Sequence, residues 1–502
     1  MKRYLFLWHR WLGIALCLFM AMWFFSGVVM MYVGYPKLTP REHLAHLPPL
    51  ALEGCCIDPV SLAADDPDGT LQSVRLTSLR GEPHYVLGYA DGGRVVVNAR
   101  SGERVTSISP AQALQAAQQF APNTPMQAQG LIDEDAWTHS RGLDAERPLY
   151  RVQLQDAEQR LLYISSQTGA VVRDATANER LWNWVGAWIH WLYPLRGNWL
   201  QPAWHNTVVY LSAAATVMAL LGMLLGVMRW RGKRRYRNGS HSPYSGMGRW
   251  HHLVGLGAGA LLVTWIFSGL MSMNPWSIFS PGEPLDTRAY AGGVLGPERL
   301  AQSPAQSLQR FQASGFDPVE LVWRRVAGEM LLVAQDASGA TRVSLGGGPV
   351  RERLPAALLE RAAAAVWPAV EPPMQWLNAY DFYYYPRTEH SMLGHLAKPL
   401  PVLRVEYPDG ARTWLHIDPY TGEILSQASS GRRTSRVLFA LLHSWDWLPL
   451  LQNRPLWDVL MLGFSIGGLL ISLTGTVMGW RRLRSRAAAR RRVRLQSAAL
   501  RY

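Results

Sequence analysis

Four histidines stand in matched positions beside long apolar stretches of the chain. His9 and His251 lie near the start of two of these stretches, and His190 and His443 lie in short segments that precede the other two. Ionisable side chains at membrane depth are rare and mark functional sites by default. Two imidazoles that face each other from neighbouring helices at one level can hold one haem iron between them. We therefore expect His9 and His251 to form one haem site and His443 to contribute to a second.

Each site leaves an alternative open. His190 or His205 supplies the second ligand beside His443: the internal repeat favours His190, whereas His205 lies on an apolar stretch itself. His252 is the fallback for its neighbour His251, because successive residues on a helix point about 100° apart. A lone histidine at a membrane interface is more often a headgroup contact or a packing residue, and a duplicated chain copies such histidines too.

The histidines belong to that repeat. Residues 8–13 and 250–255 both read Trp-His-x-x-x-Gly, and Ser-Gly follows 17 residues after each of these histidines. Residues 220–230 match residues 473–481 in the same way. Each unit is a helix, a polar segment and a helix, so it crosses the membrane twice and its copy has the same orientation. We expect two parallel repeats.

Four apolar runs are long enough to span a bilayer, which requires roughly 20 residues. They occupy residues 5–33, 204–230, 252–273 and 457–480. The first lacks a prompt small-x-small cleavage site and has an internal copy, so we expect it to be retained rather than removed as a signal peptide. The expected fold class is therefore a membrane protein with four transmembrane helices.

Basic residues collect on one side of these spans. They cluster before the first span, in the loop 231–249 and in the tail 482–502, and they account for the net charge of +14. The positive-inside rule puts both termini and this loop in the cytoplasm. The charge is thus a topology signal and a contact with anionic lipid, and we expect no nucleic-acid partner.

Residues 34–180 and 275–433 are polar and lie outside the membrane in this topology. Strands that flank an Asp-Gly turn, as in 402–417, predict hairpins, and Ala-rich runs at 110–119 and 355–366 predict one helix for each sheet. We expect two small α+β domains. In chain order the expected segments are helix 1 at 1–33, the first outer domain at 34–180, an interfacial segment at 181–201, helix 2 at 202–230, a basic loop at 231–249, helix 3 at 250–274, the second outer domain at 275–433, an interfacial segment at 434–454, helix 4 at 455–481 and a basic tail at 482–502.

Three further motifs complete a family resemblance. Residues 417–423 read Ile-Asp-Pro-Tyr-Thr-Gly-Glu, residues 381–385 read Asp-Phe-Tyr-Tyr-Tyr, and residues 442–446 read Leu-His-Ser-Trp-Asp. With the Trp-His and Ser-Gly marks, the chain resembles the PepSY-associated transmembrane family over nearly its whole length. The resemblance implies two periplasmic PepSY-like domains in a bacterial inner-membrane protein linked to iron and siderophore uptake, and some family members are haem-containing ferric-siderophore reductases. The first domain departs from the pattern, because residues 164–169 lack the Asp-Pro of the turn.

The histidines and the resemblance together predict a ferric-siderophore reductase with two haem b groups, whose ligand levels lie roughly 30 Å or more apart by helix rise. Electrons from a cytoplasmic or quinol donor would cross the membrane and release iron from a hydroxamate-like chelate in the periplasm. Hard oxygen ligands hold Fe(III) far more tightly than Fe(II), so one electron suffices and we expect no general base or nucleophile. The rivals are a non-enzymatic anchor whose PepSY domains bind a peptide or regulate a peptidase, and a carrier for an iron chelate or a peptide.

A polar and aromatic cluster in the second domain is the expected contact with the chelate. Its members are Asp381, Tyr383, Tyr384, Tyr385, Arg387 and His390. Aromatic faces beside arginine suit a ferric hydroxamate, and the equal alternative is a sheet edge packed on a helix.

Cysteine adds little chemistry. The sequence has no Cys-x-x-Cys-His motif, which argues against covalently attached haem. Cys17 falls within an apolar run as a packing residue. Cys55 and Cys56 are neighbours, which do not close an unstrained bridge with each other.

Overall fold

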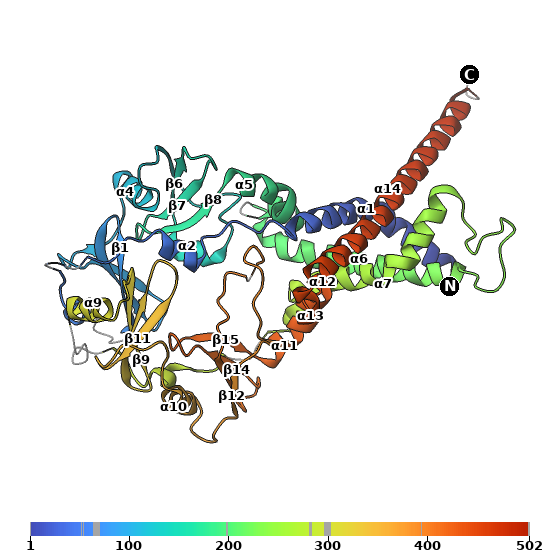
Figure 1. Ribbon diagram of the computed structural model, residues 1–502. Coiled ribbons are helices and arrows are strands. Elements are labelled where there is room, and N and C mark those ends of the chain that lie inside the picture. The colour runs from blue at the N-terminus through green and yellow to red at the C-terminus, as the bar shows by residue number, and fades with distance from the viewer. Residues whose placement is uncertain are drawn as a thin grey trace. The chain divides into compact units, whose positions relative to one another are not determined.

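The chain folds into two compact units, whose elements are labelled in Figure 1. The computed structural model describes residues 2–51, 53, 55–63, 71–196, 199–280, 284–295, 303–392 and 394–499. What we call the membrane unit comprises Met1–Gly34, Trp182–Ser280 and Gly431–Tyr502. What we call the sheet unit comprises Tyr35–Leu181 and Pro281–Ser430. Neither unit is continuous in sequence, so each is completed only when both halves of the chain are present.

All four predicted spans are helices of the membrane unit. They are α1 (Lys2–Met30), α6 (Gln201–Arg229), α7 (Gly246–Ser272) and α14 (Arg454–Ala499), and each contains a stretch long and apolar enough to cross a membrane. α14 continues past the predicted span through the basic tail, because alanine and arginine are both strong helix formers.

The four helices pack in a ring in which α1 and α7 each contact both α6 and α14. Small residues allow the close approach. A Cβ atom at Gly468 would lie 2.6 Å from the Phe24 ring, and one at Gly259 would lie 2.1 Å from Met223 Sδ. Glycine serves this purpose between membrane helices, where packing rather than hydrophobic burial holds the helices together.

Two short helical segments precede α6 and α14. Each begins with a π-helical turn, η2 (Trp184–Trp188) and η6 (Arg436–Leu441), and runs on to a histidine, His190 or His443. Left-handed residues end both segments, Leu192 with φ 53° and Trp445 with φ 47°. Single π-helical turns are frequent at functional sites. The other short elements around this unit are α5 (Ala177–Asn183), η3 (Tyr193–Leu195), η4 (Pro275–Ser277), α11 (Ser430–Ser435), α12 (Leu442–Ser444) and α13 (Leu448–Gln452).

One seven-stranded sheet joins the two polar segments of the chain (Figure 1). Its order is β11-β10-β9-β1-β2-β3-β4, and the central pair β1 and β9 is antiparallel, with Ser73 opposite Arg324 and Thr77 opposite Glu320. The segments expected as separate domains therefore share one sheet. The strands are β1 (Leu71–Leu79), β2 (Glu82–Tyr89), β3 (Arg94–Asn98), β4 (Arg104–Val105), β9 (Glu320–Val326), β10 (Glu329–Gln335) and β11 (Thr341–Leu345).

Two four-stranded antiparallel sheets complete the sheet unit, in the orders β5-β6-β7-β8 and β12-β13-β14-β15. The predicted Ala-rich helices are confirmed as α4 (Pro110–Phe120) and α10 (Ala356–Val366), and the predicted hairpin 402–417 is confirmed as β13 and β14. A capping box at Ser109 with Pro110 in the first turn fixes the start of α4. The remaining elements are α2 (Pro40–Ala45), α3 (Pro59–Ala63), β5 (Met126–Ile132), η1 (Arg141–Glu146), β6 (Leu149–Leu154), β7 (Leu161–Ser165), β8 (Val171–Ala175), α8 (Arg288–Ala291), α9 (Pro304–Ala313), β12 (Met374–Leu377), β13 (Val402–Glu406), β14 (Trp414–Ile417) and β15 (Ile424–Ala428).

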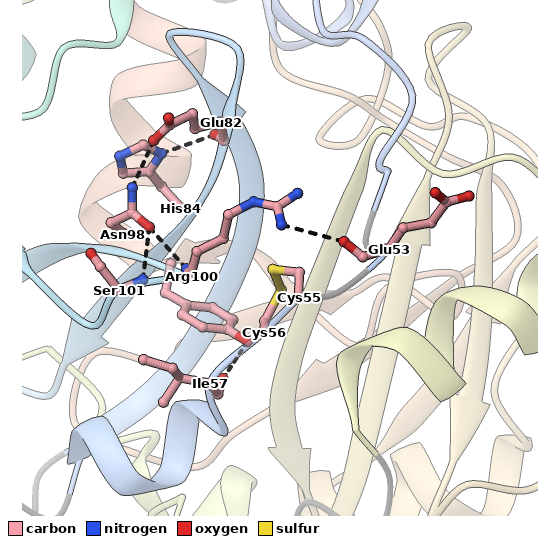
Figure 2. The surroundings of a disulfide bond; sticks show 10 residues. Glu53, Cys55, Cys56, Ile57, Glu82, His84, Asn98, Arg100 and Ser101 are labelled. Atoms are coloured by element: carbon pink, nitrogen blue, oxygen red, sulfur yellow. Dashed lines mark hydrogen bonds between the residues drawn. A yellow bond between two sulfur atoms is a disulfide. The ribbon is translucent and has the colours of Figure 1, made fainter.

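Cys55 and Cys56 form a disulfide with each other, shown with its surroundings in Figure 2. The peptide bond between the two residues is cis. The next residue is tied to the shared sheet: Tyr85 Oη donates to the Ile57 carbonyl at 2.9 Å, and Ile57 N donates to the Ala99 carbonyl at 2.9 Å. The bridge itself links no distant parts of the chain.

Candidate functional site

The first histidine pair lies between α1 and α7. The ring centroids of His9 and His251 are 6.4 Å apart, and the ring planes make an angle of 49°. Both side chains are half-buried among the four helices. The structure thus brings together two histidines that are 242 positions apart in the sequence.

Backbone carbonyls fix the rings of this first pair. His9 Nδ1 donates to the Met218 carbonyl of α6 at 3.1 Å, and His251 Nδ1 lies 3.1 Å from the Ile471 carbonyl and 2.9 Å from Thr474 Oγ1, both on α14. A carbonyl oxygen only accepts, so each Nδ1 carries the ring hydrogen and each Nε2 keeps its lone pair. Within the described residues, neither Nε2 atom has a hydrogen-bond partner.

Glycines of the second apolar stretches leave room for these rings. A Cβ atom at Gly222 would lie 2.8 Å from His9 Cε1. A Cβ atom at Gly475, the matched position of the repeat, would lie 3.4 Å from His251 Cε1 and 2.5 Å from Cys17 Sγ. Any larger residue at either position would push a ring or its neighbour aside.

The second histidine pair lies between the two short segments that precede α6 and α14. The ring centroids of His190 and His443 are 6.2 Å apart, with an angle of 71° between the ring planes. Of the two alternatives for the partner of His443, the structure brings His190 to it. His205 is an exposed residue in the first turns of α6.

Serine hydroxyls fix the rings of this second pair. Ser26 Oγ lies 3.0 Å from His190 Nδ1, and Ser268 Oγ lies 3.0 Å from His443 Nδ1. Each hydroxyl donates its own hydrogen to a carbonyl one turn earlier in its helix, at 2.7 Å for Ser26 and 2.8 Å for Ser268. Each serine oxygen therefore accepts from Nδ1–H, and Nε2 again keeps its lone pair.

The Ser-Gly dipeptides of the repeat contact the second histidine pair, which was not predicted from the sequence. A Cβ atom at Gly27 would lie 3.5 Å from His190 Cε1, and one at Gly269 would lie 3.8 Å from His443 Cε1. The serine orients the ring and the glycine makes room beside it. Ser268 is 17 residues beyond His251 on α7, which places the two levels about 26 Å apart by helix rise. This is shorter than expected, because His443 is bonded to Ser268 inside the helix rather than lying beyond its end.

Each pair has the spacing of two axial ligands on one metal. A metal–imidazole bond is about 2.0–2.1 Å and the ring centroid lies roughly 1.1 Å beyond the nitrogen, so two rings facing each other across one metal have centroids about 6.2–6.4 Å apart. The observed separations are 6.4 and 6.2 Å.

The donor set fits a macrocycle better than a bare ion. A bare metal ion in a protein takes four or more ligands, and no group of three or more His, Cys, Asp and Glu that could hold an ion occurs in the described part of the chain. A haem brings four equatorial nitrogens of its own and requires only axial ligands. The residues of both pairs therefore fit a haem.

His252, the fallback ligand, has hydrogen-bond partners at both ring nitrogens. Its Nδ1 lies 2.7 Å from Ser242 Oγ and its Nε2 lies 2.9 Å from the Gly226 carbonyl. Both ring nitrogens are thus engaged in holding the 231–249 loop and the end of α6.

Two of the six members of the expected substrate cluster, Tyr384 and Tyr385, are buried in the sheet unit. Tyr384 is fully buried, its Oη donates to the Pro399 carbonyl at 2.9 Å, and its ring stacks on His416 with centroids 4.8 Å apart. Burial, with the neighbouring Arg404, lowers the pKa of His416 to about 3, so this histidine is neutral. Asp381 Oδ2 accepts an ion pair from Arg404 at 2.6 Å. These contacts are those of a packed sheet.

The other members differ in exposure. Tyr385 is buried, whereas Tyr383 is 36 % exposed and packs edge-on against Trp414 with centroids 5.3 Å apart. Arg387 and His390 are partly exposed. The side chain of Asp381 is 34 % exposed. Asp381, Tyr383, Arg387 and His390 are therefore the members of the cluster that reach the surface.

Four helices long and apolar enough to cross a membrane define a multi-pass membrane protein. The chain belongs to the family described as the PepSY-associated TM region, which it matches over residues 6–379. The matched range contains His9, His190 and His251 and ends before His443. None of the curated proteins matches this chain.

Proposed function

We propose that this protein is an inner-membrane ferric-siderophore reductase with two haem b groups. The observation that carries the proposal is the separation of the ring centroids in the two histidine pairs, 6.4 and 6.2 Å. At either separation the two rings of a pair could hold one haem between them, and all four Nδ1 atoms are engaged so that Nε2 is available. The first pair lies on α1 and α7, and the second pair is hydrogen-bonded to serines near the other ends of the same two helices.

His9 with His251 would hold one haem, and His190 with His443 would hold the other. The bound haems would supply one-electron transfer between the two levels of the membrane unit. The protein's own contribution is to present four neutral imidazoles in fixed orientations. Two carbonyls, the Thr474 hydroxyl and two serine hydroxyls do this, and partners that orient ligands in this way tune both affinity and basicity.

The basic segments support an orientation for this transfer. The 231–249 loop and the basic end of α14 favour the cytoplasmic side for the first pair. The second pair then lies toward the periplasm, where we place the PepSY-like sheet unit. The electron donor would be a cytoplasmic protein or a membrane quinol.

The iron-uptake part of the proposal rests on the family resemblance and on the surface of the expected substrate cluster. Tyr383, Arg387 and His390 offer an aromatic ring, a guanidinium and an imidazole at the surface of the sheet unit. Such groups suit a ferric hydroxamate chelate. Transfer of one electron to the iron gives Fe(II), which the hard oxygen ligands release, and no proton transfer by the protein is required.

Two measurements on purified protein test the proposal. Haem quantitation should give two haems per chain, with a Soret band that shifts on reduction by dithionite. The reduced protein is then mixed anaerobically with a ferric hydroxamate siderophore while a chromogenic chelator traps Fe(II). Reoxidation of the haem should match the Fe(II) trapped, one for one.

The same measurements separate the rivals. Protein that contains no haem would point to the anchor or the carrier. Protein with two haems that no ferric chelate reoxidises would retain the haem sites and exclude the siderophore reductase.

A further inference from the structure

A buried ion pair closes the segment that carries His443. Arg436 Nη1 donates to Asp446 Oδ1 at 2.7 Å, and Arg436 Nη2 donates to the Asp446 carbonyl at 3.1 Å. The Asp446 side chain is fully buried, and that of Arg436 is 13 % exposed. A charged pair with this little exposure to water is a costly feature, because apolar residues of similar volume are often as stabilising.

The pair spans the ligand segment from end to end. Arg436 begins η6, His443 lies in α12, and Asp446 follows the left-handed residue Trp445 that ends the segment. A third bond, from Trp457 Nε1 to the Ser444 carbonyl at 2.9 Å, ties the same segment to α14. The ion pair therefore fixes the backbone on both sides of His443.

The matched segment of the other repeat has no such pair. Counted back by the 253 positions that separate His190 from His443, the equivalent residues are Asn183 and Tyr193. Asn183 is 1 % exposed, and neither polar atom of its side chain has a hydrogen-bond partner in the described part of the chain. The segment around His190 thus has the same shape without buried charge.

We propose that Arg436 and Asp446 are positioning residues for His443 and that their two charges set the reduction potential of the group held by the second pair. The inference rests on the proposed function, since it requires a haem at that pair. A haem gains one electron on reduction, so a nearby uncompensated cation favours the reduced form and an uncompensated anion favours the oxidised form. In a water-poor site such effects are much larger than at a surface. As the two charges stand together, they nearly cancel.

The test is a redox titration of purified, haem-loaded single variants, with the two haems resolved by their optical spectra. Asp446→Asn removes one negative charge beside the segment and should shift the reduction equilibrium of the second haem about tenfold toward the reduced form. Arg436→Gln removes one positive charge and should shift it about tenfold the other way. A tenfold change is 59 mV for one electron. The double variant should return close to the wild-type value, and the first haem should not move.

Two matched controls separate charge from packing. Arg436→Lys keeps the positive charge and should leave the potential within a factor of about three of wild type, although it loses the two-pronged contact. Asn183→Ala changes the equivalent position of the other repeat without changing charge and should shift neither haem.

The outcomes are distinct. Shifts of the two single variants in the same direction, or no shift in either, would overturn the proposed role of the charges. A shift in Arg436→Lys as large as that in Arg436→Gln would do the same. If the variants lose the second haem, the titration uses the double variant and Arg436→Lys, and a double variant far from the wild-type potential contradicts the proposal. Wild-type protein without haem would sink the proposed function itself.

Discussion

The two histidine pairs have the same spacing and are held in different ways. Carbonyls of α6 and α14 orient the first pair, with Thr474 Oγ1 as an additional acceptor beside His251, whereas serine side chains of α1 and α7 orient the second. A carbonyl belongs to every residue, so no substitution removes it, and the adjacent glycine is the position at which the His9 side of the first pair is vulnerable. A serine hydroxyl is removed by one substitution. The first pair therefore depends mainly on the backbone, and the second depends on side chains.

The largest effect should follow from removing a ligand. His251→Ala and His443→Ala should each lower the haem content from two to one per chain, because one axial nitrogen is lost from one pair only. His252→Ala is the matched control for the first pair and should keep both haems, since both nitrogens of His252 are already hydrogen-bonded. Haem quantitation on purified protein decides the matter. Loss of haem in His252→Ala but not in His251→Ala would show that the first pair is misassigned.

A methyl group beside the first pair should have the next largest effect. Gly222→Ala places a Cβ atom 2.8 Å from His9 Cε1, so the ring must move. Overpacking of this kind costs about 1–3 kcal/mol, and we expect the first haem to be lost while the second remains. Gly257→Ala is the control, because a Cβ atom there meets nothing within 4 Å. Optical spectra of the purified variants measure the haem content. Equal haem loss from Gly222→Ala and Gly257→Ala would show that the close approach to His9 is not the cause.

Removing a serine should weaken the second pair without abolishing it. Ser268→Ala deletes the acceptor of His443 Nδ1–H, and loss of such a partner typically costs 10–100-fold in affinity for the bound metal group, so we expect about that effect. Ser272→Ala is the control on the same helix, since its hydroxyl donates to the Gly269 carbonyl. The rate of haem transfer to excess apomyoglobin provides the measurement. In wild-type protein, we expect haem to leave the first pair more slowly than the second. An unchanged rate of haem loss in Ser268→Ala would contradict the role of Ser268 in holding the second pair.

The smallest effect tests whether the two halves of the second pair are held alike. Trp23 Nε1 donates to the His190 carbonyl at 3.0 Å. The matched Trp265 is buried, and its Nε1 has no acceptor within the part of the chain that the structure describes. Trp23→Phe should cost about 0.5–1.5 kcal/mol, seen as a lower temperature of haem release from the second pair, whereas Trp265→Phe should leave that temperature unchanged. Equal shifts in the two variants would mean that the hydrogen bond contributes nothing.

The spans could be predicted from the sequence because length and apolarity are local properties. His9 and His251 could be paired because they occupy equal depths in matched stretches. The choice between His190 and His205 could not be made from the sequence, since each lies near the same end of a span. The structure distinguishes them by the 6.2 Å separation of the His190 and His443 rings and by the exposure of His205. The backbone carbonyls that accept from the first pair could not be predicted from residue types, because every residue has a carbonyl.

The sheet unit was less predictable for a related reason. Hairpins and Ala-rich helices follow from neighbouring residues, and these were found where expected. The pairing of β1 with β9 joins strands from opposite halves of the chain, and no local pattern encodes it. Tyr384 shows the same limit, because an aromatic run with a polar flank is equally typical of a binding face and of a packed core.

The shared sheet also sets an order for biogenesis. Ser73 of β1 can pair with Arg324 of β9 only after β9 has been synthesised, and α6 and α7 are synthesised before it. At 5–20 residues per second, a ribosome requires roughly 12–50 s to make the intervening chain. During that time β1 has β2 on one side and an open edge on the other, and an open edge is a template for wrong partners. Completion of the sheet therefore depends on correct insertion of the α6–α7 hairpin, and a chain that stops in the 231–249 loop ends with that edge unpaired.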